Sequence, residues 1–147
     1  MKQIIQFSDL EKIKKIKILK VFYWFVRISM GFGFVLSGMR KLPGIRFTIL
    51  SNDNPAGAFF NAMYDTGFYW NFIGYFQILL GILIFFNRFV VLTSVLMMPV
   101  TFNIFLVSIA LNMKGTPIIT STMLMANIFL LVWNQKNYKN LFLKPLK

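Results

Sequence analysis

Four long apolar stretches separated by polar segments set the pattern of this chain. The second and third stretches are joined by only two polar residues, Asn87 and Arg88. A helix of about 20 residues, rising 1.5 Å per residue, covers the roughly 30 Å hydrocarbon layer of a bilayer. We therefore predict an all-α integral membrane protein, a bundle of four transmembrane helices. The predicted spans are 21–39, 68–86, 89–111 and 118–133.

Three polar segments flank or interrupt this membrane domain of residues 21–133. Residues 1–20 are basic and amphipathic, and Ser8 followed by Glu11 fits a capping box, which predicts an N-terminal interfacial helix. A simple positively charged anchor is the alternative for this segment. Residues 40–66 form a long outer loop with room for a short interfacial helix, and 134–147 form a basic tail.

Composition narrows the chemistry open to the chain. Its residues are 57% hydrophobic and 14% charged, with no cysteine, no histidine and only four acidic residues. Disulfides, thiol redox chemistry and Cys/His ligation of a metal or haem are therefore excluded within the chain. So few carboxylates also argue against a metal site or a paired-acid active site. We predict no catalytic residue, no metal and no cofactor held by the chain's own ligands, and thus no enzyme by itself.

The net charge of +12 is interpreted as a topology signal. A bundle sheathed by lipid has no basic face for nucleic acid, so no nucleic-acid partner is predicted. Eleven Lys and Arg residues lie in the two terminal segments and at Arg88, against four in residues 40–66 and at Lys114. This bias places both termini in the cytoplasm, with the bundle in a prokaryotic inner membrane. Tyr69 and Trp70 fit an aromatic belt at the outer interface.

Isolated polar side chains inside the spans are the candidate site. Such groups are costly in hydrocarbon and turn toward protein, water or a ligand. Arg27 has a second interpretation, in which its side chain extends back to the inner interface. For the set as a whole the alternative is a network that only ties helices together. The candidates are Arg27, Gln77, Asn103 and Asn127.

Small residues accompany the polar ones on the same helix faces. In the first span Arg27, Gly31, Gly38 and Lys41 share a face, which favours close helix packing and places Lys41 at the mouth of the bundle. In the third span Pro99 removes a backbone hydrogen bond and predicts a kink. The second span repeats the pattern, with Asn71 at the mouth and Gly74, Gln77 and Gly81 on the shared face.

The run that carries Arg27, Gly31, Phe34, Gly38 and Lys41 resembles the first-span signature of the DoxX family of small membrane proteins. The glycine-rich second span and the P-x3-N-x-F pattern beginning at Pro99 resemble DoxX-like proteins as well. The resemblance covers about residues 27–133 and implies a four-span fold. It also implies similarity to the small subunit of an archaeal thiosulfate:quinone oxidoreductase. Many relatives carry Glu where this chain has Gln77, which argues against proton handling at that position.

Three functions remain open from the sequence. The first is a non-catalytic accessory or structural subunit of a membrane complex, and it leads. The second is a quinone-interacting subunit of a membrane oxidoreductase, in which the polar set would bind a quinone carbonyl. The third is a small transporter or lipid-binding protein. The partners expected are membrane lipids together with other membrane subunits or further copies of the chain.

Overall fold

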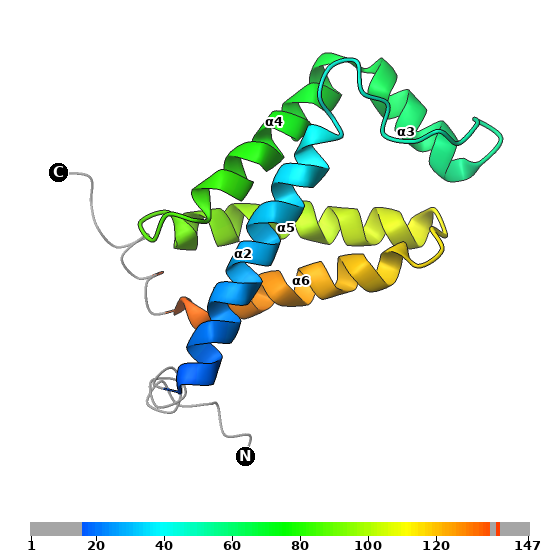
Figure 1. Ribbon diagram of the computed structural model, residues 1–147. Helices are drawn as coiled ribbons and strands as arrows, with labels where there is room; N and C mark the ends of the chain where they lie inside the picture. The colour runs from blue at the N-terminus through cyan, green and yellow to red at the C-terminus, as the bar shows by residue number, and fades with distance from the viewer. Residues whose placement is uncertain (1–15, 136–137, 139–147) are drawn as a thin grey trace.

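A computed structural model describes residues 16–135 and 138, and all regular structure in this part of the chain is helical. The all-α class is thereby confirmed. Three of the helices, α2, α5 and α6, are long and apolar enough to cross a membrane. Figure 1 shows all five, which are α2 (Lys17–Met39), α3 (Pro55–Asp65), α4 (Phe68–Leu83), α5 (Val90–Ala110) and α6 (Thr116–Trp133).

Helices α4 and α2 differ most from their predicted ranges. Helix α4 ends at Leu83 rather than at residue 86, and turns occupy residues 84–89. Its 16 residues measure about 24 Å, short of a full hydrocarbon layer. Helix α2 begins at Lys17, four residues before the predicted span. The proposed interfacial helix and the basic tail lie almost wholly outside the described residues.

Helices α2 and α4 form a tightly packed antiparallel pair. A Cβ built on Gly38 would lie 2.6 Å from the carbonyl oxygen of Gly74. A Cβ on Gly81 would lie 2.8 Å from the carbonyl oxygen of Gly31. Real side chains do not approach a backbone so closely, so each glycine allows the opposite helix to come near. Gly31 and Gly38 of α2 and Gly74 and Gly81 of α4 thus lie where the two helices meet.

Helices α5 and α6 form the second antiparallel pair, and Figure 1 shows it inclined against the α2/α4 pair. Ser108 of α5 and Thr120 of α6 share a hydrogen bond of 2.8 Å between their hydroxyls. The chain reverses between these helices at Gly115, whose φ of +78° suits a residue without a side chain. A buried apolar core joins the two pairs and includes Met30, Phe34, Leu80, Ile84, Met97 and Leu130.

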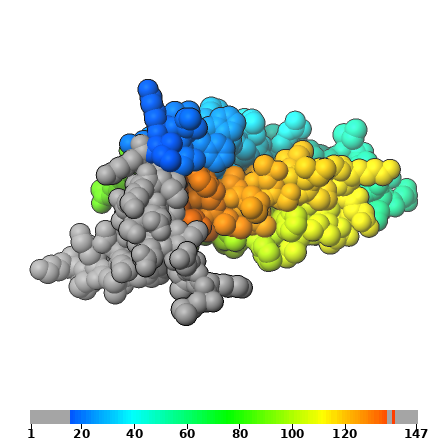
Figure 2. All heavy atoms as spheres, turned by 90° about the horizontal axis from the view of Figure 1, so that it is seen from below, coloured from blue at the N-terminus to red at the C-terminus, as the bar shows by residue number. Residues whose placement is uncertain are grey.

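The beginning of α2 lies against the end of α6, as Figure 2 shows from below. The rings of Tyr23 and Trp133 stack with their centroids 5.2 Å apart, and Phe22 meets Phe129 edge-on at the same distance. The first and last of the described helices therefore meet at one end of the molecule.

Helix α3 covers the opposite end. The side chain of Asn54 accepts from the backbone N–H of Ala56 at 2.9 Å, and Pro55 is the first helical residue. Both features are favoured at a helix N-terminus. The ring of Phe60 in α3 lies 4.4 Å from that of Phe47 and 6.2 Å from that of Trp70, between ring centroids. This aromatic cluster fastens α3 and the preceding loop onto α4.

Candidate ligand-binding site

A cavity of about 360 Å³ lies between the two helix pairs, beneath α3. Its size falls in the range of pockets that hold small molecules. The walls are mainly aromatic and aliphatic, and a small number of polar side chains interrupt them. Among the lining residues are Ser37, Lys41, Phe60, Trp70, Ile73, Phe76, Gln77, Pro99, Asn103 and Val107.

Lys41, two residues beyond the end of α2, supplies the positive charge of the cavity. Only 6% of its surface is exposed. Its Nζ donates to the backbone carbonyl and to the hydroxyl of Ser37, both at 2.9 Å, and lies 5.0 Å and 5.3 Å from the ring centroids of Phe47 and Trp70. Burial lowers the pKa of Lys41 to about 8. An ammonium has three hydrogens, so one remains beyond the two used on Ser37.

A line of polar groups leads from Lys41 into the bundle. The hydroxyl of Ser37, one helical turn before Lys41, donates to Oε1 of Gln77 at 3.5 Å. Gln77 is buried, and its amide nitrogen has no hydrogen-bond partner among the described residues. The order along this line is Lys41, Ser37 and Gln77, and its inner end offers a donor.

Two further donors at the cavity have no partner in the described part of the chain. The indole Nε1 of Trp70 is buried without a hydrogen bond, and the residue is only 3% exposed. A buried N–H left unpaired costs about 1–3 kcal/mol, and such groups are rare in folded proteins. Asn103 on α5 is exposed and makes no hydrogen bond. The free polar groups of this cavity thus include the third hydrogen of Lys41 and the amides of Gln77 and Asn103, which a ligand with acceptor atoms could satisfy.

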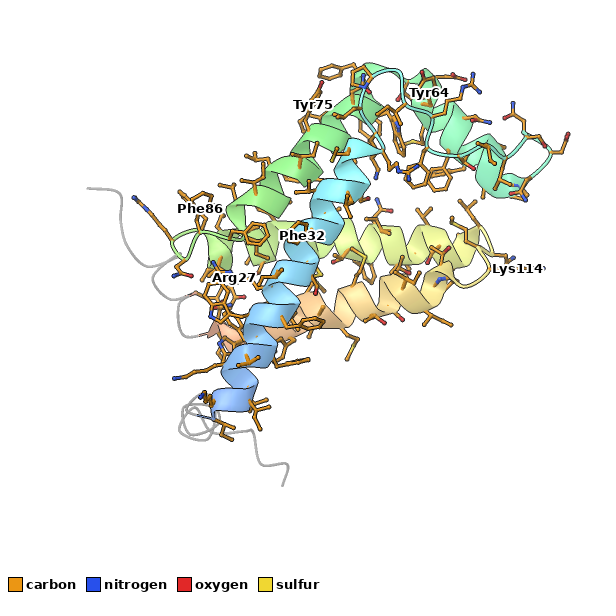
Figure 3. All side chains as sticks on the ribbon, in the orientation of Figure 1. Arg27, Phe32, Tyr64, Tyr75, Phe86 and Lys114 are labelled. Carbon is orange, nitrogen blue, oxygen red and sulfur yellow. The ribbon has the colours of Figure 1, made fainter. Side chains whose placement is uncertain are left out.

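Arg27 lies away from the cavity, in the half of α2 nearer its N-terminus. Its Nε donates to the carbonyl of Ile84 at 2.5 Å and its Nη1 to Oδ1 of Asn87 at 2.6 Å. Ile84 is the C-cap residue that follows α4, so the guanidinium caps the C-terminus of that helix, where a cation is favoured. Figure 3 shows Arg27 and Lys114 at opposite ends of the molecule.

Asn127 ties α6 to α5. Its side-chain nitrogen faces the carbonyl of Ser94 at 3.1 Å, and its oxygen accepts from the Met98 amide at 3.0 Å and the Thr101 hydroxyl at 3.1 Å. In this orientation each end of the amide faces a group of complementary kind, donor to acceptor. Asn127 therefore bonds to the turn of α5 that surrounds Pro99.

The polar set predicted from the sequence is divided rather than gathered into one network. Gln77 and Asn103 line the cavity, whereas Arg27 and Asn127 bond elsewhere. The physical reason is distance, because Arg27 and the Ser37 that contacts Gln77 are ten residues apart on α2, about 15 Å along the axis. Of the predicted mouth residues, Lys41 lines the cavity, and half-buried Asn71 is not in its walls. Pro99 lines it within an α5 that stays helical on both sides.

Ser37 and Trp70 are the site residues that the sequence did not single out. The spacing of Ser37 four residues before Lys41 places both on one helix face, and this signal was available. Trp70 fitted an interface belt, yet it is buried beside Lys41. Its position depends on the packing of α3, which the sequence pattern does not specify.

Within the described residues, no group of three or more His, Cys, Asp or Glu side chains is placed to hold a metal ion. No family model, curated protein or solved structure matches the chain.

Proposed function

We propose that this chain crosses the membrane four times and binds an amphipathic small molecule, taken from the bilayer, in the cavity beside Lys41. The observation that carries the proposal is the buried cation of Lys41 in an otherwise apolar cavity, whose walls also include Gln77 and Asn103 with amide groups free to bind a ligand. A pocket with apolar walls and a few convergent polar groups is the usual form of a small-molecule site. Catalysis is not part of the proposal, because the chain has no Cys or His.

The arrangement of helix ends supports four crossings. Arg27 bonds to Asn87 in the α4–α5 turn, and one turn earlier on α2 Tyr23 stacks on Trp133 at the end of α6. The beginning of α2, the α4–α5 turn and the end of α6 thus share one end of the molecule. Residues 40–67 and the α5–α6 turn lie toward the other end, as Figure 1 shows. An even number of crossings produces this arrangement, and α4 would be the short crossing.

Exposed residues on the cavity wall support entry from the lipid. Phe72 of α4 is 53% exposed and lines the cavity. Asn103, on the facing side of α5, is exposed and lines it too. An amide at this depth of a span would be costly against acyl chains alone. A ligand lying between α4 and α5 would give this amide a partner.

An accessory or structural subunit is the second candidate, because Arg27 and Asn127 have their partners inside the chain and tie helices together. The DoxX resemblance stays a prediction and bears on both candidates. If the chain is an accessory subunit, other subunits of the complex would carry out any catalysis. A quinone is one ligand of the proposed class, since its carbonyls would accept from Gln77 and Asn103.

The test is purification of the full chain in mild detergent, followed by native mass spectrometry and mass spectrometry of the extract. We expect about one amphipathic molecule per chain, lost from Val107→Phe, which fills the cavity without removing a polar group. Thr122→Ala, on the exposed face of α6, is the matched control and should retain the molecule. Absence of any bound molecule from wild type, in detergent and in lipid nanodiscs alike, would leave the structural subunit as the better account.

A further inference from the structure

We propose that the ligand is an amphiphile with a single anionic oxygen head group, a carboxylate or a phosphodiester, and an apolar tail. The head group binds at Lys41 and Trp70, and the tail lies along the apolar walls. This inference rests on the proposed function, which requires only that some amphipathic molecule binds. It specifies the charge of the head group and the two residues that recognise it.

The charge of the residues that line the cavity is the first observation that supports an anionic head group. Lys41 is buried in the cavity wall, and none of the described residues that line the cavity is an Asp or Glu. The two acidic residues of the described chain, Asp53 and Asp65, are both exposed. A buried ammonium is expected to have a counter-ion, because desolvating an unpaired charge is costly. Lys41 is the single cationic residue among the described residues that line the cavity, so a ligand with one negative charge would balance it.

Geometry carries the second step. The ammonium of Lys41 lies over the face of the Trp70 ring, 5.3 Å from its centroid. The indole Nε1–H of Trp70 has no partner among the described residues, and because this atom is buried, the indole would have to rotate for a head group on Lys41 to reach it. Both residues line the cavity. A head group with two acceptor oxygens would satisfy both donors, and the bond to Lys41 would be charge-assisted and thus the stronger one. Phe60, Ile73 and Val107 continue the wall and provide apolar surface for a tail.

Cationic and zwitterionic head groups fit less well. Aromatic rings often hold quaternary ammonium groups, but Phe47 and Trp70 already lie around the ammonium of Lys41. A second cation there would be repelled, and no carboxylate would offset the repulsion. A neutral carbonyl compound remains the main competitor, since Gln77 and Asn103 would donate to it without help from Lys41.

The experiment compares two probes that differ in head-group charge. Oleate and its uncharged methyl ester are titrated onto the full chain in phosphatidylcholine nanodiscs at pH 7.5. We expect oleate to bind about tenfold more tightly or better, as one charge-assisted hydrogen bond allows. In Lys41→Met this preference should disappear through weaker oleate binding, with methyl oleate unchanged. Trp70→Phe retains the ring but not the N–H and should weaken oleate by several-fold. Lys114→Met removes an exposed lysine outside the cavity and should change neither affinity.

Two further measurements distinguish a phospholipid from a free anion as the source of the head group. If phosphatidylglycerol nanodiscs abolish oleate binding while phosphatidylcholine ones do not, a phospholipid head group is the occupant. Acetate and inorganic phosphate, which lack a tail, should not compete. Equal affinities for oleate and methyl oleate, unchanged in Lys41→Met, would overturn the inference and leave the proposed function standing. Failure of both probes and of phosphatidylglycerol, with nothing co-purifying, would overturn both. If Lys41→Met fails to fold by size-exclusion chromatography, Trp70→Phe decides.

Discussion

Arg27 illustrates what determines the role of a charged residue inside a helix of this kind. Its side chain is 1% exposed, and it does not line the cavity. Instead it closes the end of α4 through the carbonyl of Ile84 and holds the following turn through Asn87. The ring of Trp24, 4.5 Å from the guanidinium carbon, covers one side of the charge. The charge is thus used to end one helix and position the next.

Replacing Arg27 with Met should therefore destabilise the fold without altering ligand binding. The change leaves the Ile84 carbonyl and the Asn87 amide oxygen without a donor, at a cost of about 2–3 kcal/mol. Chemical unfolding in detergent, followed by circular dichroism, measures this loss. Arg88→Met, an exposed arginine in the same turn, should stay within about 0.5 kcal/mol of wild type. Equal stabilities for the two variants would contradict the capping role.

At this scale the sequence could predict which polar residues are of interest but not what they contact. Arg27, Gln77 and Asn127 are all buried, as expected of polar groups in apolar helices. Their partners depend on how the helices rotate against each other. The Ile84 carbonyl is a backbone group 57 residues from Arg27, and no side-chain pattern marks it. For the same reason, the sequence could not show that the indole N–H of Trp70 is buried without a hydrogen-bond partner among the described residues.

At the scale of the elements, α2 and α4 are held together by their glycines rather than by large side chains. Gly38 and Gly74 lie against each other's carbonyls at one level, and Gly31 and Gly81 do so about two turns away. Sequence spacing predicted that each helix has one small-residue face. That these faces meet each other is a property of the packed pair.

In α2, a glycine at the contact with α4 can be substituted and compared with a glycine of the same helix outside that contact. Gly38→Ala would place a methyl group 2.6 Å from the Gly74 carbonyl and force the helices apart, at a cost of about 1–3 kcal/mol. Gly33→Ala, in the same helix, meets only the end of the Met123 side chain at 3.8 Å. It should be neutral or slightly stabilising, because alanine favours a helix more than glycine does. Thermal unfolding of both variants in one detergent tests this, and equal midpoints would count against close α2–α4 contact.

For the whole molecule, the decisive question is whether α4 crosses the bilayer. The all-α class and the three long apolar helices followed from hydrophobic run length alone. The end of α4 did not, because Phe85 and Phe86 continue the apolar run while the backbone already turns. The length of an apolar run shows which residues can lie in lipid. The hydrogen bond from Arg27 to the Ile84 carbonyl marks where α4 ends. The cavity was also beyond the sequence, since it arises from the inclination of one helix pair against the other.

Single cysteines introduced into this cysteine-free chain determine the number of crossings. In intact cells, Asp53→Cys and Lys114→Cys should react with a membrane-impermeant maleimide, and Arg88→Cys should react only after permeabilisation. All three positions are exposed in the structure. If α4 does not cross, Arg88→Cys will label together with Asp53→Cys. A positive-inside orientation requires the first pattern.

The length of α4 has a consequence for the lipid around it. If this 16-residue helix is a crossing, about 6 Å of hydrocarbon thickness must be met by other means. The apolar side chains of the 84–86 turn cover part of the gap, and thinning of the adjacent leaflet would cover the rest, at a fraction of a kcal/mol per ångström. This local thinning of the bilayer beside the cavity would bring lipid head groups deeper into the membrane than usual. The protein would then be most stable in thin bilayers, and host lipids with longer acyl chains would lower its stability.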